Sequence, residues 1–153
     1  MIHLTDADLE PLLDAEQAQA ALREAFAALG AGQAAMQARV RTEAGGVKLS
    51  TLGAVIPGQG VVGAKVYTTI AGRFTFVILL FSAATGEPLA VLDAGAITRC
   101  RTAACSVIAA QYLARREARS LAVLGLGVQG QAHLSQFLQA FPVATVRLWS
   151  PHL

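Results

Sequence analysis

A glycine-rich segment near the carboxyl end carries the clearest chemical pattern. The segment GLGVQG, residues 125–130, follows an apolar run at 120–124 and precedes a helical pattern at 131–140, and a second strand is expected at 145–149. In such a turn the first glycine permits the tight bend, the second lets the backbone approach a pyrophosphate, and the third lets helix and strand pack closely. The pattern predicts a bound dinucleotide at the start of the helix. The alternative is a turn that uses glycine for packing alone.

The position that would face the adenosine ribose lies about 20 residues beyond the glycines, at the end of the second strand. NAD sites usually have Asp or Glu there, and this sequence has Ser150, followed by Pro151 and His152. The missing carboxylate removes a repulsion that would exclude a 2′-phosphate, which favours NADP modestly. No arginine stands next to it, so NAD and NADP both stay open.

Cationic residues upstream could hold a small acid. Lys65 lies inside an expected strand and shares one face with Val61 and Gly63, because side chains alternate along a strand. It either faces a cavity or protects an edge strand from aggregation. Arg39 and Arg41 lie in a loop after the second expected helix, and sequence alone does not choose between them.

A fourth cation, Arg101, stands near an expected helix start. If Thr98 caps that helix, Arg101 lies in its first turn, where the helix dipole disfavours positive charge. A bound carboxylate or phosphate would explain it, and a solvated arginine is the alternative. Cys100 would share this turn and have a lowered thiol pKa, but no histidine is near it in sequence, so no nucleophile is expected. The three histidines of the chain form no ligand cluster, and no metal site is predicted.

Helices and strands must position these residues. Thr5 and Asp8 have capping-box spacing, and Asp14 is expected to cap a second helix that ends near Gly30. Runs rich in branched and aromatic residues, bounded by Gly or Pro, predict four mostly antiparallel strands followed by a helix. The strands are expected at Val47–Ile56, Gly60–Ile70, Arg73–Ser82 and Pro88–Asp93, and the helix at Thr98–Arg115.

Composition excludes several classes of protein. The 153 residues are 54% hydrophobic and 14% charged, with a net charge of +2, which excludes a disordered chain and argues against a nucleic-acid-binding module. The longest apolar run, Phe76–Phe81, is too short to span a membrane, and no signal peptide is readable. Cys100 and Cys105 would lie about 140° apart around one helix and cannot pair, which favours the cytoplasm. So apolar a chain is expected to associate or to lack part of a partner surface.

Three segments together resemble the ornithine cyclodeaminase/mu-crystallin family: TGEPLAVLD at 85–93, TRCRTAA at 98–104 and the glycine turn. The resemblance implies an α/β protein, with an N-terminal α+β substrate and dimerisation domain at 1–116. The start of a Rossmann-type parallel sheet would follow at 117–153. It also implies NAD or NADP as cofactor, a small amino or imino acid as substrate, and a homodimer formed through the N-terminal sheet.

The resemblance also assigns roles to residues. Arg39, Lys65 and Arg101 would bind the substrate, with both arginines on its carboxylate and Lys65 catalytic. Around the cofactor it implies Gly125, Gly127, Val128, Gln129 and Gly130 at the pyrophosphate and Ser150 at the ribose.

The implied activity is reduction of a cyclic imine or ketimine, with ornithine cyclodeamination as the alternative. Family members are about twice as long, and their catalytic aspartate lies beyond the glycine turn. A truncated or fragmentary chain without turnover, surviving as a dimerising or ligand-binding module, is therefore a third hypothesis.

Overall fold

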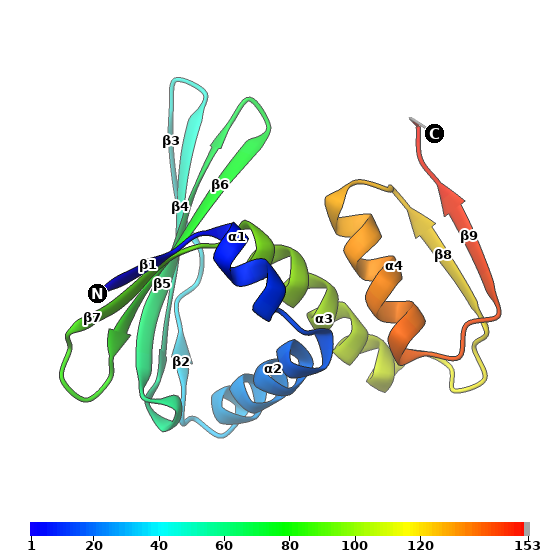
Figure 1. The fold of residues 1–153 in the computed structure, drawn as a ribbon, viewed down its shortest axis with the longest axis horizontal. Coiled ribbons are helices and arrows are strands. Elements are labelled where there is room, and N and C mark those ends of the chain that lie inside the picture. Colours follow the sequence, from blue (N-terminus) through cyan, green and yellow to red (C-terminus); the bar gives the residue numbers. More distant parts are fainter. Residues whose placement is uncertain (152–153) are drawn as a thin grey trace. The chain divides into compact units, whose positions relative to one another are not determined.

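A computed structural model describes residues 1–151 of the protein, and His152 and Leu153 lie outside the described residues (Figure 1). The chain forms two compact units. The first consists of Met1–Leu12 and Glu24–Thr98, and the second of Leu13–Arg23 and Arg99–Leu153. None of the helices within residues 1–151 is long and apolar enough to cross a membrane.

The first unit is built on a seven-stranded sheet. Its strand order is β1-β7-β6-β5-β4-β2, with β3 also paired to β4, and every pair is antiparallel except β1 with β7. The four predicted strands are confirmed, whereas β1, β2 and β3 were not predicted. The strands are β1 (Ile2–Leu4), β2 (Ala35–Met36), β3 (Val40–Ala44), β4 (Val47–Ile56), β5 (Val61–Ile70), β6 (Arg73–Ser82) and β7 (Pro88–Asp93).

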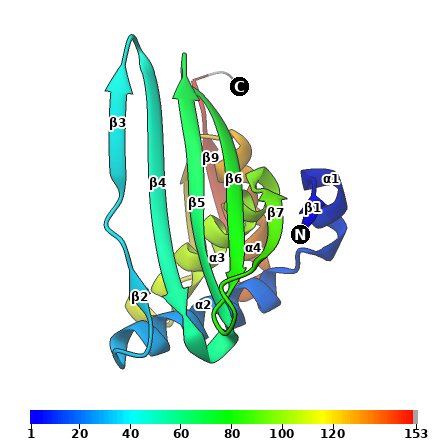
Figure 2. The same ribbon diagram turned by 90° about the vertical axis from the view of Figure 1, so that its left-hand side faces the viewer.

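One face of this sheet is not covered by any helical segment of the first unit (Figure 2). Tyr67 and Ser50 point to the opposite face and are buried, at 7% and 0% exposure. Strand alternation then places the apolar side chains of the intervening positions on the open face. Several of these side chains keep 40–50% of their surface exposed, namely Val47, Leu49, Val55 and Ile70. The open face therefore has the exposed apolar surface that the hydrophobic composition predicted.

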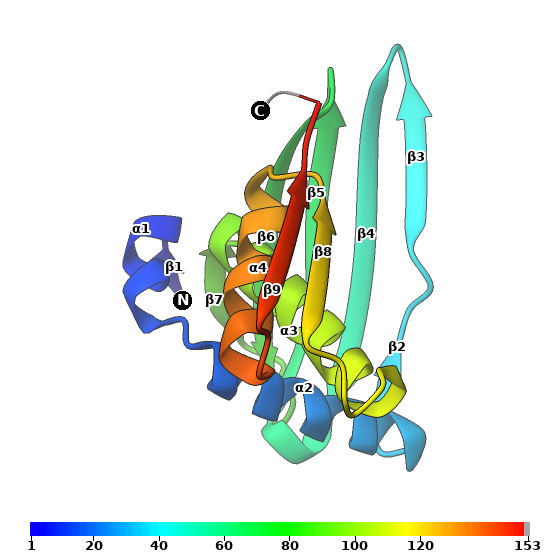
Figure 3. The ribbon, with the colours of Figure 1, turned by 90° about the vertical axis from the view of Figure 1, so that its right-hand side faces the viewer.

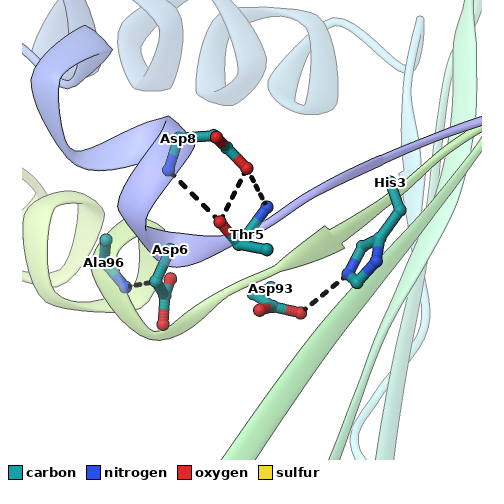
Figure 4. A network of polar contacts seen from close by, with 6 residues as sticks. All are labelled: His3, Thr5, Asp6, Asp8, Asp93 and Ala96. Carbon is teal, nitrogen blue, oxygen red and sulfur yellow. Dashed lines mark hydrogen bonds and ion pairs between the residues drawn. The ribbon is translucent and has the colours of Figure 1, made fainter.

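Short-range caps fix the first two helices as predicted. Thr5 and Asp8 form the capping box of α1 (Asp6–Leu9), which runs into a 3-10 turn at Glu10–Leu12 (Figure 4). A second 3-10 turn, Pro57–Gln59, joins β4 to β5. The Asp14 carboxylate accepts the backbone N–H of Gln17 at 2.9 Å, at the start of α2 (Ala15–Gly30).

The third helix begins earlier than predicted. α3 spans Gly95–Leu113, so Thr98 is not its N-cap, and the N–H of Thr98 donates to the Ala94 carbonyl within the first turn at 3.0 Å. A residue distant in sequence provides the cap, because the N–H of Ala96 donates to Asp6 Oδ1 at 2.8 Å (Figure 4). A Cβ on Gly95 would lie 2.5 Å from Asp6 Oδ2, so glycine makes this approach possible.

The second unit contains a βαβ arrangement (Figure 3). β8 (Ser120–Leu124) and β9 (Thr145–Trp149) pair in parallel and are connected through α4 (Val128–Ala140). This confirms the predicted start of a Rossmann-type parallel sheet.

Candidate functional site

Lys65 lies at the centre of the sheet of the first unit, on β5. Its directly opposite neighbours are Leu52 on β4 and Ile78 on β6. The ammonium nitrogen lies 5.3 Å from the centre of the Tyr67 ring and 5.0 Å from that of Phe76. Both distances fall within the range of cation–π attraction, which holds the charge above the aromatic pair. Lys65 is therefore no edge-strand lysine, and the strand order rules out that alternative.

Tyr67 belongs to a row of side chains that crosses four strands. The register aligns Arg41 with Ser50, Ser50 with Tyr67, and Tyr67 with Phe76. The Arg41 guanidinium donates from Nε to Ser50 Oγ at 3.0 Å and from Nη2 to the Tyr67 hydroxyl at 3.4 Å. Tyr67 and Phe76 contact each other with ring centres 5.2 Å apart. The row thus joins a guanidinium, two hydroxyls and an aromatic wall beside Lys65.

The electrostatics of this cluster are strongly positive. The hydrogen bond with Ser50 lowers the pKa of the Tyr67 phenol despite its burial, and the hydrogen bond from Arg41 and the charges of Arg39 and Arg41 lower it further. The structure brings the Arg41 guanidinium and the Lys65 ammonium to this one tyrosine, and Arg39, in the loop just before β3, contributes its charge. Such a cluster suits an anionic group of a small ligand.

Sequence reasoning missed Arg41 as a partner of Tyr67, and it missed Ser50 and Phe76 altogether. Their signal was the two-residue alternation on neighbouring strands, which places Ser50, Tyr67 and Phe76 on one face once the register is known. Placing Arg41 beside Tyr67 required predicting the strand β3. All five residues of β3 are exposed, so no buried apolar pattern indicated this strand.

Arg101 lies in the second unit and is exposed. Because α3 begins at Gly95, Arg101 falls in its second turn, and the prediction that placed it in the first turn is wrong. The helix dipole disfavours a cation mainly in the first turn, so the position of Arg101 no longer requires a bound anion to explain it. The substrate role of Arg101 now depends on the family resemblance.

The prediction for Cys100 is also wrong. Burial raises the pKa of its thiol, although a hydrogen bond from Gln136 acts in the opposite direction. The thiol lies beyond the first turn and beside α4, where the Gln136 side chain also donates to the Cys100 carbonyl at 3.1 Å. Cys100 is a packing residue of the second unit.

The glycine turn has the geometry that its three glycines predict. Gly125 has a φ of +98°, which side chains disfavour. A Cβ on Gly130 would lie only 1.9 Å from the Gly125 carbonyl oxygen, so the third glycine allows the close packing. A Cβ on Gly127 would meet nothing within 4 Å. Space is therefore open at the second glycine, where a ligand would approach the backbone.

The residues around this turn leave the start of α4 accessible. Gly127 is the N-cap and provides no side-chain cap, and Val128 and Gln129 in the first turn are exposed. The Gly125 N–H donates to the Trp149 carbonyl at 2.8 Å, which brings the end of β9 beside the turn. Ser150 follows directly, as the ribose position requires.

These features define a class: an α/β protein with a βαβ glycine turn typical of dinucleotide-binding folds and a separate cationic sheet face. The family model for the ornithine cyclodeaminase/mu-crystallin family matches residues 2–152, and the chain belongs to this family.

Known relatives agree with that assignment. A probable ornithine cyclodeaminase from Bordetella pertussis is 57% identical with a TM-score of 0.97, and the match covers 100% of this chain and 49% of that one. The NAD(P)H-dependent anabolic L-arginine dehydrogenase DauB of Pseudomonas aeruginosa is 36% identical over 96% of this chain and 49% of its own length. The Δ1-pyrroline-2-carboxylate reductase of Thermococcus litoralis, solved with NADH and L-proline, is 25% identical with a TM-score of 0.91, over 99% of this chain and 50% of that one. The chain thus spans about half the length of these relatives.

Proposed function

We propose that the protein takes part in NAD(P)-dependent reduction of a small cyclic imino acid, of the ketimine or pyrroline-2-carboxylate type. The observation that carries this proposal is the position of Arg41 and Lys65 beside Tyr67 on one sheet face, with the charge of Arg39 acting on the same hydroxyl. Three cations favour a carboxylate ligand and disfavour a substrate with a second ammonium group, as ornithine has. The relative solved with NADH and L-proline supports the same reaction class.

Each residue has a proposed task. Arg39 and Arg101 neutralise and orient the substrate carboxylate, and Lys65 acts on the C=N group electrostatically or by proton transfer. A bound nicotinamide supplies the hydride. In this proposal residues 1–116 hold the substrate and residues 117–153 begin the cofactor domain.

The cofactor is proposed to lie at the glycine turn, where the first amides of α4 face its pyrophosphate. Gly127 leaves room for that approach, and Val128 and Gln129 flank it. Ser150 faces the ribose. Since it has no negative charge to repel a 2′-phosphate, both NAD and NADP remain candidates.

Ligand binding by the 153-residue chain tests the substrate proposal. We expect pyrroline-2-carboxylate to bind more tightly than L-ornithine in a calorimetric titration, and we expect R39Q to weaken that binding about tenfold, the effect of one lost charge-assisted contact. R73Q, which changes an exposed arginine at the far end of β6, is the matched control. Tighter binding of ornithine, or equal binding by R39Q, would contradict the proposal.

Product analysis separates the reductase from its alternative. Net NADPH oxidation with pyrroline-2-carboxylate identifies a reductase, and ammonia release from ornithine without net cofactor change identifies a cyclodeaminase. For the isolated 153 residues we expect no turnover and weak dinucleotide binding, because they form two of the about six strands of a complete dinucleotide fold. Steady-state reduction by this chain would refute that expectation and the dimerising-module alternative.

We further propose that two copies associate through the open sheet face, as the resemblance implies. The exposed apolar side chains of Leu49, Val55 and Ile70 support a contact that removes them from water. Sedimentation analysis should show a dimer that L49K converts to a monomer, whereas K48E on the opposite face leaves it intact. A monomeric wild-type chain would refute this association. We also propose a cytoplasmic location, supported by two free cysteines.

A further inference from the structure

A polar cavity of about 290 Å³ lies in the second unit, away from the glycine turn. It is lined by the first half of α2 and by the last turns of α3 and α4. Ligand pockets usually span about 300–1,000 Å³, so this volume suits a small metabolite. The lining residues are Glu16, Gln19, Arg23, Gln111, Gln139 and Ala140.

Gln19 is the residue in this cavity that indicates a ligand. Its side chain is only 8% exposed, and it forms no hydrogen bond with any other residue of the described chain, 1–151. The amide atoms of Gln19 are not among the fully buried unpaired polar atoms of residues 1–151, so they remain open to the cavity. Since Gln19 lines the cavity, a polar molecule bound there would provide the missing partner.

The charges of the cavity define the chemistry of that molecule. Glu16, Gln19 and Arg23 are spaced three and four residues apart, so they follow one face of α2. The Arg23 guanidinium donates to the side-chain carbonyl of Gln111, which orients it toward α3 and leaves other donors of its planar group available. A simple anion would be repelled by Glu16, and a simple cation by Arg23. A molecule with both charges is attracted to both residues.

We propose that this cavity is a binding site for a free α-amino acid, separate from the proposed catalytic site. Glu16 receives the ammonium group, Arg23 receives the carboxylate, and the Gln19 amide pairs with the polar atoms between them. The site requires no residue of the Lys65 cluster and no cofactor. Its ligand belongs to the class of molecule that the proposed reduction would produce, which suits a regulatory site.

Calorimetric titration of the 153-residue chain with L-glutamine, L-proline and L-alanine tests the proposal. We expect at least one of them to bind at millimolar concentration or below. We expect its N-acetyl derivative, which lacks the ammonium charge, and its amide, which lacks the carboxylate, to bind at least tenfold more weakly. E16Q, R23Q and Q19L should each reduce the affinity at least fivefold, with folding checked by circular dichroism.

Matched variants distinguish this site from the catalytic one. Q17L, on an exposed position of the same helix, should bind like the wild type, and so should K65M. Loss of binding in K65M with normal binding in E16Q and R23Q would place the ligand at the catalytic cluster and overturn the proposal. Equal binding in all variants, or none at 20 mM (about twenty times a millimolar Kd), would overturn it as well. Neither result would affect the evidence for the reductase, which depends on the cationic cluster around Tyr67 and is tested by R39Q.

Discussion

Replacing Gly127 by alanine tests the cofactor site without disturbing the turn that forms it. A methyl group at this position would meet no atom of the protein within 4 Å. The backbone φ of −68° is also one that alanine adopts readily. The change therefore adds bulk only in the space where the pyrophosphate is proposed to approach.

The two expected effects differ in size. Alanine is a poorer N-cap than glycine, by about 0.5–1 kcal/mol, and it restricts the unfolded chain, which stabilises by about 0.4–1 kcal/mol. These effects offset each other, so the free energy of unfolding should change by less than about 1 kcal/mol. A displaced phosphate would lose at least one charge-assisted hydrogen bond, about 1.5–3 kcal/mol. Dinucleotide affinity should then fall about tenfold to a hundredfold.

Titration with NADPH, followed by the ¹⁵N–¹H shifts of the turn amides, measures the affinity even when binding is weak. Urea unfolding of the same variant measures stability. G58A is a matched control, because a Cβ on Gly58 also meets nothing within 4 Å and that glycine belongs to the first unit. A folded G127A that binds NADPH as tightly as the wild type would show that the turn serves packing alone.

Three further predictions concern the fold around both sites. G130A should destabilise the second unit by about 3 kcal/mol in urea unfolding, because its Cβ would lie 1.9 Å from the Gly125 oxygen. D6A should cost about 1 kcal/mol through loss of the α3 cap, and unchanged stability would refute that role. Absorbance titration at about 295 nm, the tyrosinate band, should show an ionisation step below the ordinary tyrosine pKa of about 10. Y67F should remove this step and Y112F should retain it. Since the folded state lowers the pKa of Tyr67, its stabilising contribution is complete above the unfolded-state pKa and is lost as pH falls through the folded-state value.

Local patterns made much of the fold predictable. The strands β4 to β7 are bounded by glycine or proline, and they alternate or run apolar over six to ten residues. The βαβ unit follows from glycine spacing that only a strand–turn–helix explains. For these elements, sequence patterns that span about 10 residues were sufficient to predict the secondary structure.

The parts that escaped prediction depend on distant residues. The cap of α3 comes from Asp6, 90 residues before Ala96, and no local signal distinguishes it from the nearer Thr98. The strand β3 has five exposed residues, and it becomes a strand through pairing with β4. The first-turn position predicted for Arg101 was wrong for the same reason, since its place in the helix depends on where the helix begins.

The cationic sheet face owes its existence to two hairpin turns outside it. Gly45 and Gly46 both have positive φ, as do Ala71 and Gly72, which is the geometry of two-residue turns that join twisted strands tightly. The first turn sets the register of β3 on β4, and the second sets that of β5 on β6. Because strand side chains alternate, a shift of one residue in the first hairpin would move Arg41 to the open face and away from Tyr67. The ligand chemistry proposed for this face therefore depends partly on turn residues outside the cluster. Among residues 1–151, Ala71 is the non-glycine residue with positive φ, so the turn that sets the register of β5 on β6 has a strained backbone.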